Sequence, residues 1–80
     1  MKIYWSGESK NLVGREVKRL RRKAGLTQRA LAARLQLAGL DVTDLTILRI
    51  ENGTRFVPDY EVKALAEALE VSCGRLLGED

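Results

Sequence analysis

The sequence predicts an all-α domain built from five short helices. Its 80 residues suffice for one small domain. Aromatic residues make up 5% of the chain, and no convincing period-two stretch indicates a strand. Five segments instead repeat apolar residues at helical spacing, and each is bounded by a capping residue or a glycine.

A short arm, residues 1–10, precedes the first helix and carries Tyr4 and Trp5. We expect the helix itself to span about residues 11–24, because its apolar residues form one stripe and Gly25 can end it. The members of the stripe are Val13, Val17, Leu20 and Ala24.

The second helix is predicted to begin at Thr27, whose hydroxyl can cap the first turn, and to end before Gly39. Its inward residues are Leu31, Ala32 and Leu35. The third helix is short: Thr43 is the expected cap and Gly53 the terminator. Ile47 and Ile50 are its buried pair, since residues three apart share a helix face.

The last two helices are predicted from Pro58 and Asp59, which can start one helix, and from Ser72, which can cap another before Gly78. The expected apolar residues are Val62, Leu65, Ala66 and Leu69 in the fourth helix and Leu76 and Leu77 in the fifth. The globular domain is therefore expected over residues 11–78.

Two blocks are typical of the halves of a helix-turn-helix: residues 25–28 (Gly-Leu-Thr-Gln) and residues 46–53 (Thr-Ile-Leu-Arg-Ile-Glu-Asn-Gly). The first opens a helix with a turn glycine and a capping threonine. The second closes a helix with an acid, an amide and a glycine. Because the second helix of such a motif fits the major groove, the blocks predict double-stranded DNA as a partner.

The charge distribution agrees with a polyanionic partner. The net charge is +3, but residues 10–34 hold nine basic side chains against Glu16 alone. Residues 59–80 reverse the balance, with two basic and six acidic side chains. Basic charge in the first helix should add salt-dependent affinity for DNA, although a plain solvated basic face is an equal alternative.

Other functional classes lack support in the sequence. With Cys73 as the single cysteine and no histidine, the chain offers no internal disulfide, no Cys-based zinc site and no activated thiol. It also lacks a phosphate-cradling glycine loop. We therefore expect no catalysis, cofactor or metal. No apolar run approaches the roughly 20 residues that span a bilayer, so we expect no membrane segment and a cytoplasmic protein.

Further matches extend the two blocks along the chain. They are Leu20-Arg21, Leu31-Ala32, Pro58, Leu65-Ala66, Ala68-Leu69, Val71-Ser72 and Leu76-Leu77. These segments and the two blocks, residues 25–28 and 46–53, follow one another in the order of a known family pattern. On this basis the chain resembles the Cro/phage-repressor (XRE) helix-turn-helix family over residues 11–78. The resemblance implies a compact five-helix, lambda-repressor-like domain with helices 2 and 3 as the motif. It also implies a homodimeric regulator of transcription, such as a small phage or prophage repressor.

The resemblance also implies roles for individual residues. Those implied to face DNA bases are Asp44, Leu45, Thr46 and Arg49. Those implied to face phosphates are Gln28, Thr43, Asn52, Thr54 and Arg55; a polar helix start and a plain surface charge are the alternatives for Gln28 and Arg55. Arg21 and Glu51 match a partly buried ion pair. Arg29 joins the phosphate group on a physical argument, because a cation in a first helical turn opposes the helix dipole unless an anion binds there.

Two departures from the family pattern shape the expectations. The segment of residues 33–42 is longer than the usual three- or four-residue turn of the motif. We therefore predict one extra turn of the second helix and a longer connecting turn around Gly39. We expect Leu37 and Leu40 to cover the extra helical turn. The reading face also contains Asp44, Leu45 and Leu48, where DNA readers usually carry Arg, Lys, Asn or Gln. Base specificity is therefore expected to be modest or partly indirect.

That apolar face leaves a second hypothesis open. The chain is alternatively a protein-interaction module, such as an antitoxin, that binds a protein partner through Leu45 and Leu48. The surface of the expected homodimer is also open, with Tyr4-Trp5 and Leu76-Leu77 as the two candidates.

Overall fold

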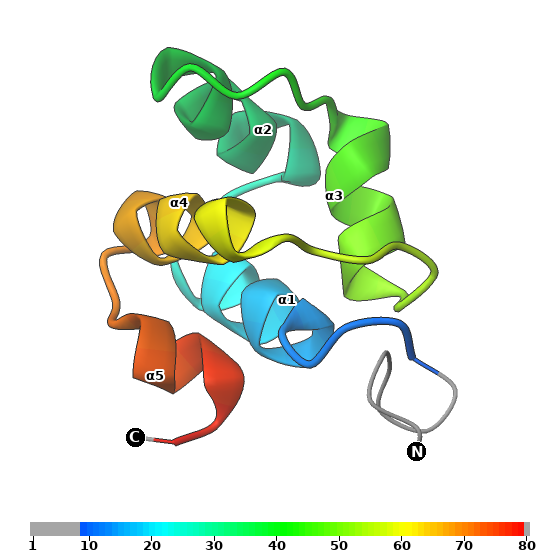
Figure 1. The fold of residues 1–80 in the computed structure, drawn as a ribbon. Coiled ribbons are helices and arrows are strands. Elements are labelled where there is room, and N and C mark those ends of the chain that lie inside the picture. The colour runs from blue at the N-terminus through cyan, green and yellow to red at the C-terminus, as the bar shows by residue number, and fades with distance from the viewer. Residues whose placement is uncertain (1–8, 80) are drawn as a thin grey trace.

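A computed structural model describes residues 9–79, which form the five helices expected for an all-α domain (Figure 1). The helices are α1 (Gly14–Lys23), α2 (Gln28–Leu37), α3 (Asp44–Glu51), α4 (Asp59–Leu69) and α5 (Cys73–Leu77). α2 and α3 pack together at one end, α5 lies at the other, and α1 and α4 cross between them (Figure 1). No helix within residues 9–79 is both long enough and apolar enough to cross a membrane.

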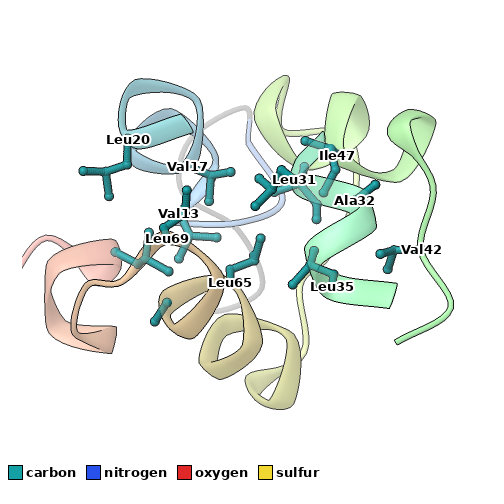
Figure 2. Close-up of a cluster of buried hydrophobic side chains, with 13 residues drawn as sticks. Val13, Val17, Leu20, Leu31, Ala32, Leu35, Val42, Ile47, Leu65 and Leu69 are labelled. Carbon is teal, nitrogen blue, oxygen red and sulfur yellow. The ribbon is translucent and has the colours of Figure 1, made fainter. Parts of the chain in front are cut away.

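Every helix contributes to a single core, part of which is shown in Figure 2. The buried hydrophobic residues are Val13, Val17, Leu20, Leu31, Ala32, Leu35, Val42, Ile47, Ile50, Leu65, Ala66, Leu69 and Leu76. Most of them occupy the predicted apolar stripes. Ala24 does not: α1 ends at Lys23, and Ala24 lies exposed at the helix end, so its predicted place in the stripe was wrong.

The five helices end in the same hydrogen-bond pattern. In each, a backbone N–H two or three residues beyond the helix donates to a carbonyl of the last turn. Leu26 N–H donates to Arg21 O at 3.0 Å after α1, and Val71 N–H donates to Ala66 O at 2.9 Å after α4. The pattern requires a left-handed residue just before that N–H. Glycine fills this position after four helices, whereas α4 uses Glu70 at φ 59°.

The connection between α2 and α3 is longer than in a minimal motif, as predicted. α2 ends at Leu37, Gly39 turns the chain at φ +94°, and an extended stretch leads to Thr43. The side chain of Gln36 fixes this stretch by donating from Nε2 to Val42 O at 2.7 Å. Val42 is buried beneath it.

Leu37 does not cover the extra helical turn, and that prediction was wrong. The side chain is 90% exposed, whereas Leu40 is partly buried against the core. The reason is helical geometry: Leu31 and Leu35 share the inward face of α2, and a residue two positions after Leu35 points roughly 200° away from it.

The start of α1 also differs from the prediction. The helix begins at Gly14, three residues later than expected, and Asn11 lies before it. Asn11 Oδ1 accepts from Gly14 N–H at 2.7 Å, while its Nδ2 donates to Ile50 O at 3.1 Å and to Arg55 O at 2.9 Å. This one side chain therefore joins the start of α1 to the end of α3 and to the loop that follows.

The structure bears on only one of the two candidate dimer surfaces. Tyr4 and Trp5, with most of the predicted arm, lie outside the described residues. Leu76 is fully buried in the core and is unavailable to a partner, so of that pair only Leu77 reaches the surface.

Candidate nucleic-acid interface

α3 presents two faces of opposite character. Ile47 and Ile50 point into the core and are essentially inaccessible to solvent. The outward face carries Asp44, Leu45, Leu48, Arg49 and Asn52, all exposed. Leu45 and Leu48 are 47% and 42% exposed, so the outward face combines apolar and charged side chains. Of the four residues predicted to contact bases, Asp44, Leu45 and Arg49 thus lie on this exposed face.

Thr43 and Thr46 form a reciprocal cap at the start of α3. Thr46 N–H donates to Thr43 Oγ1 at 3.4 Å, and Thr43 N–H donates to Thr46 Oγ1 at 3.1 Å. Both hydroxyls therefore stabilise the helix start. Thr46 is also half-buried, so it lies at the margin of the outward face.

Arg29, Thr43 and Asp44 line a shared hollow between α2 and α3 with a volume of about 320 Å³. No side-chain partner is found for Arg29 within residues 9–79. Asp44 Oδ1 accepts from the N–H of Leu45 at 2.9 Å, as suits a carboxylate in a first helical turn. An anion entering this hollow would meet both the cation of Arg29 and the acid of Asp44.

Glu51 lies at the centre of a hydrogen-bond network at the end of α3. Its carboxylate receives Arg21 Nε at 2.6 Å, Arg21 Nη2 at 3.1 Å and Gln28 Nε2 at 3.1 Å. Arg21 Nη1 also donates to Leu26 O at 2.8 Å. The Arg21 and Glu51 side chains are 10% and 3% exposed, and the hydrogen bonds that Arg21 donates to Glu51 raise the pKa of Arg21 above its ordinary value. The network fixes the start of α2 against the ends of α1 and α3.

The loop after α3 contains the remaining residues that were predicted to contact phosphates. Asn52 Oδ1 accepts from Thr54 N–H at 3.2 Å and from Thr54 Oγ1 at 2.7 Å, which shapes a tight turn. Arg55 pairs with the buried carboxylate of Glu61, with Nη2 to Oε2 at 2.9 Å. This hydrogen-bonded pairing raises the pKa of Arg55. The structure thus gives Arg55 a partner within the chain and uses it to hold the loop against α4.

Three positioning residues were missed by the sequence reasoning. Asn11 lies three residues before Gly14, and Glu61 lies three residues after Pro58; both spacings are those of helix-start residues and were readable in principle. Arg34 was not readable. Its Nη1 donates to Ala68 O at 2.8 Å, a contact between α2 and the end of α4 that depends on the packed fold.

Within residues 9–79, no group of three or more His, Cys, Asp or Glu side chains is placed to hold a metal ion. Cys73 is exposed at the start of α5.

Comparison with known proteins gives one match. A protein-family model described as "Helix-turn-helix domain" matches residues 12–77, which include all five helices. No curated protein matches the chain. No solved structure matches it either. The family match covers most of the sequence, and the chain therefore belongs to the helix-turn-helix domain family, a DNA-binding class.

Proposed function

We propose that this protein is a sequence-specific regulator of transcription that binds operator DNA as a homodimer, in the manner of a small phage or prophage repressor. The observation that carries the proposal is the outward face of α3. It is exposed along its length, and the opposite face anchors the helix through Ile47 and Ile50. A helix held in this way can enter the major groove without breaking any contact in the core.

Arg49 is the principal base reader in this proposal. It is exposed, has no ion-pair partner within residues 9–79, and carries a guanidinium that can donate two hydrogen bonds to guanine O6 and N7. Leu45 suits a thymine methyl group, and Asp44 can accept from the N4 amine of cytosine. Thr46 would contact bases from the margin of the face. Its hydroxyl oxygen also accepts a hydrogen bond that caps α3.

Contacts to the DNA backbone would come from both ends of the helix-turn-helix. Gln28 is held by Glu51 through one N–H and keeps a second N–H for a phosphate oxygen. Arg29, Thr43, Asn52 and Thr54 lie at the exposed start of α2, the start of α3 and the following loop. Arg55 acts by holding this loop in place through Glu61. Such contacts orient the domain, while the outward face of α3 supplies specificity.

Selection of bound duplexes from a random pool tests the proposal. The wild-type protein is expected to enrich a short motif with guanine at one or more positions. A symmetric pair of half-sites, separated by about one helical turn between centres, would show dimeric reading. Retention of no duplex above background would contradict DNA binding, and an unpaired motif with a monomer in sedimentation would contradict the homodimer.

The exposed leucines favour one second candidate. Leu45 and Leu48 could bind a protein partner, as an antitoxin binds its toxin, because exposed apolar side chains in a row commonly mark an interface. Double substitution of Leu45 and Leu48 by serine separates the two functions. Loss of a co-purifying protein together with unchanged DNA retention would favour the interaction module; altered DNA preference would favour the regulator.

A further inference from the structure

α1 carries a stripe of cations on its outer surface. Arg15, Lys18 and Arg22 occupy positions i, i+3 and i+7, and all three side chains are exposed. Residues three, four and seven apart share one face of an α-helix, so these charges lie in a row. Together with Arg19 and Glu51 they line one surface hollow of about 410 Å³. We call Arg15, Lys18 and Arg22 the basic stripe.

The charges of the basic stripe are not neutralised within the described part of the chain. Arg19, on the same surface, is different: Glu16 accepts from its Nε and Nη2, both at 2.7 Å. Glu16 also lies 3.5 Å from Arg75. No carboxylate of residues 9–79 forms an ion pair with a member of the stripe.

The acid that shares the hollow does not offset the stripe. Glu51 is almost fully buried, and its carboxylate already receives Arg21 and Gln28. Three desolvated hydrogen bonds of this kind leave little of its charge to repel an anion in the hollow. The surface offered to solvent along α1 is therefore strongly cationic.

Glu51 also shows where the stripe lies relative to the helix-turn-helix. It is the last residue of α3, it holds the first residue of α2, and it borders the hollow of the basic stripe. The stripe thus lies beside the end of α3, next to the carboxylate that holds Gln28. Its ends are about 10 Å apart along the helix axis, comparable with three base-pair steps along a duplex.

We propose that the basic stripe is a second, sequence-independent contact with duplex DNA, made to phosphates that flank the segment read by α3. The inference rests on the proposed function and adds a surface outside the helix-turn-helix itself. Three cations without partners, spaced over the length of several phosphates and continuous with the motif, form an electrostatic site for a nucleic-acid backbone. Each phosphate contact releases condensed counterions, which makes its contribution measurable by salt.

The test compares two lysines that differ only in location. Lys18 lies in the stripe, whereas Lys63 is exposed on α4, and both lack an ion-pair partner within residues 9–79. The affinity of Lys18→Gln and Lys63→Gln for a random-sequence duplex of about three helical turns is measured at several salt concentrations. Lys18→Gln should flatten the plot of log K against log salt by about 0.9, and Lys63→Gln should leave it unchanged.

The triple variant Arg15→Gln/Lys18→Gln/Arg22→Gln extends the test. We expect it to flatten the slope by about 2–3 and to weaken binding at least tenfold near 0.1 M salt. Its base preference in selection should match that of the wild-type protein, and thermal melting checks that it is folded. Equal slopes for Lys18→Gln, Lys63→Gln and the wild-type protein would overturn the stripe but leave DNA reading by α3 intact. Absence of binding by the wild-type protein would overturn both.

Discussion

The carboxylate of Glu51 accepts hydrogen bonds from Arg21 and from Gln28, so the last residue of α3 holds α1 and the first residue of α2 at once. Two of its three partner atoms belong to a guanidinium that is itself almost buried. This side chain therefore adds a polar tie between the two motif helices to the packing of their buried faces. The same contact leaves Gln28 oriented before any DNA arrives.

Glu51→Ala should lower the free energy of unfolding by about 3–5 kcal/mol, because it leaves the Arg21 guanidinium buried without its counter-charge. Urea denaturation measures the change. Arg19→Gln is the control: it breaks an ion pair with Glu16 at the surface, where solvent screens the two charges and such pairs add little stability. Equal effects of the two substitutions would contradict the central position of Glu51.

Gly14→Ala should destabilise the fold, although alanine usually favours a helix by about 1 kcal/mol over glycine. A β-carbon at this position would overlap the backbone carbonyl oxygen of Ile50, and a backbone atom cannot move aside as a side chain can. We expect a net loss of about 1–3 kcal/mol, typical of overpacking, in the same denaturation assay. A gain in stability would show that α1 and α3 do not approach each other as closely as described.

Glu70→Gly should stabilise the protein by about 1 kcal/mol, because Glu70 adopts φ 59°, a left-handed conformation that costs a side-chain-bearing residue about 1–2 kcal/mol. The nearby control is Glu67→Gly inside α4, which should destabilise by about 1 kcal/mol through lost helix propensity. The two substitutions are chemically identical, so opposite shifts in the melting temperature isolate the backbone effect. Shifts of the same sign would contradict it.

Glu16 should give the fold a component of stability that is lost in acid. Its hydrogen bond from Arg19, with a smaller contribution from Arg75, holds the pKa of Glu16 below its ordinary value of 4.5. A carboxyl whose pKa is depressed in the folded state stabilises above the unfolded-state pKa, and this stabilisation disappears as the pH falls through the folded-state value. Glu16→Gln should therefore flatten the dependence of melting temperature on pH below about 4.5. An unchanged profile would mean that Glu16 contributes nothing.

The helices and the core were predictable because their signals are local. Capping residues such as Thr27 and Thr43 mark helix starts, Gly39 and Gly53 mark ends, and apolar periodicity selects the inward face. The errors at Leu37 and Ala24 have separate causes. Leu37 lies within α2 but two positions after Leu35, so its side chain faces away from the core. Ala24 lies just after the last residue of α1, where its side chain is exposed.

The candidate interface was predictable only at the level of residue positions. The family pattern placed the Arg21–Glu51 pair and the outward residues of α3, but it did not indicate that Arg55 would be held by Glu61 or that Asn11 would join α1 to α3. These contacts connect segments that meet only after folding, so the spacing of neighbouring residues in the sequence cannot identify which two residues will pair. The same is true of the hollow in which Glu51 meets the basic stripe.

In the proposed function, α3 reads bases mainly through Arg49. The most direct measurement is selection of duplexes from a random pool by the wild-type protein, by Arg49→Ala and by Arg29→Ala. We predict that Arg49→Ala relaxes the preference at the guanine position, at a cost of about 1–3 kcal/mol on the preferred duplex. Arg29→Ala should weaken binding to all sequences about equally. An unchanged selected motif for Arg49→Ala would contradict the account, because α3 would then not be the reading helix in the way described.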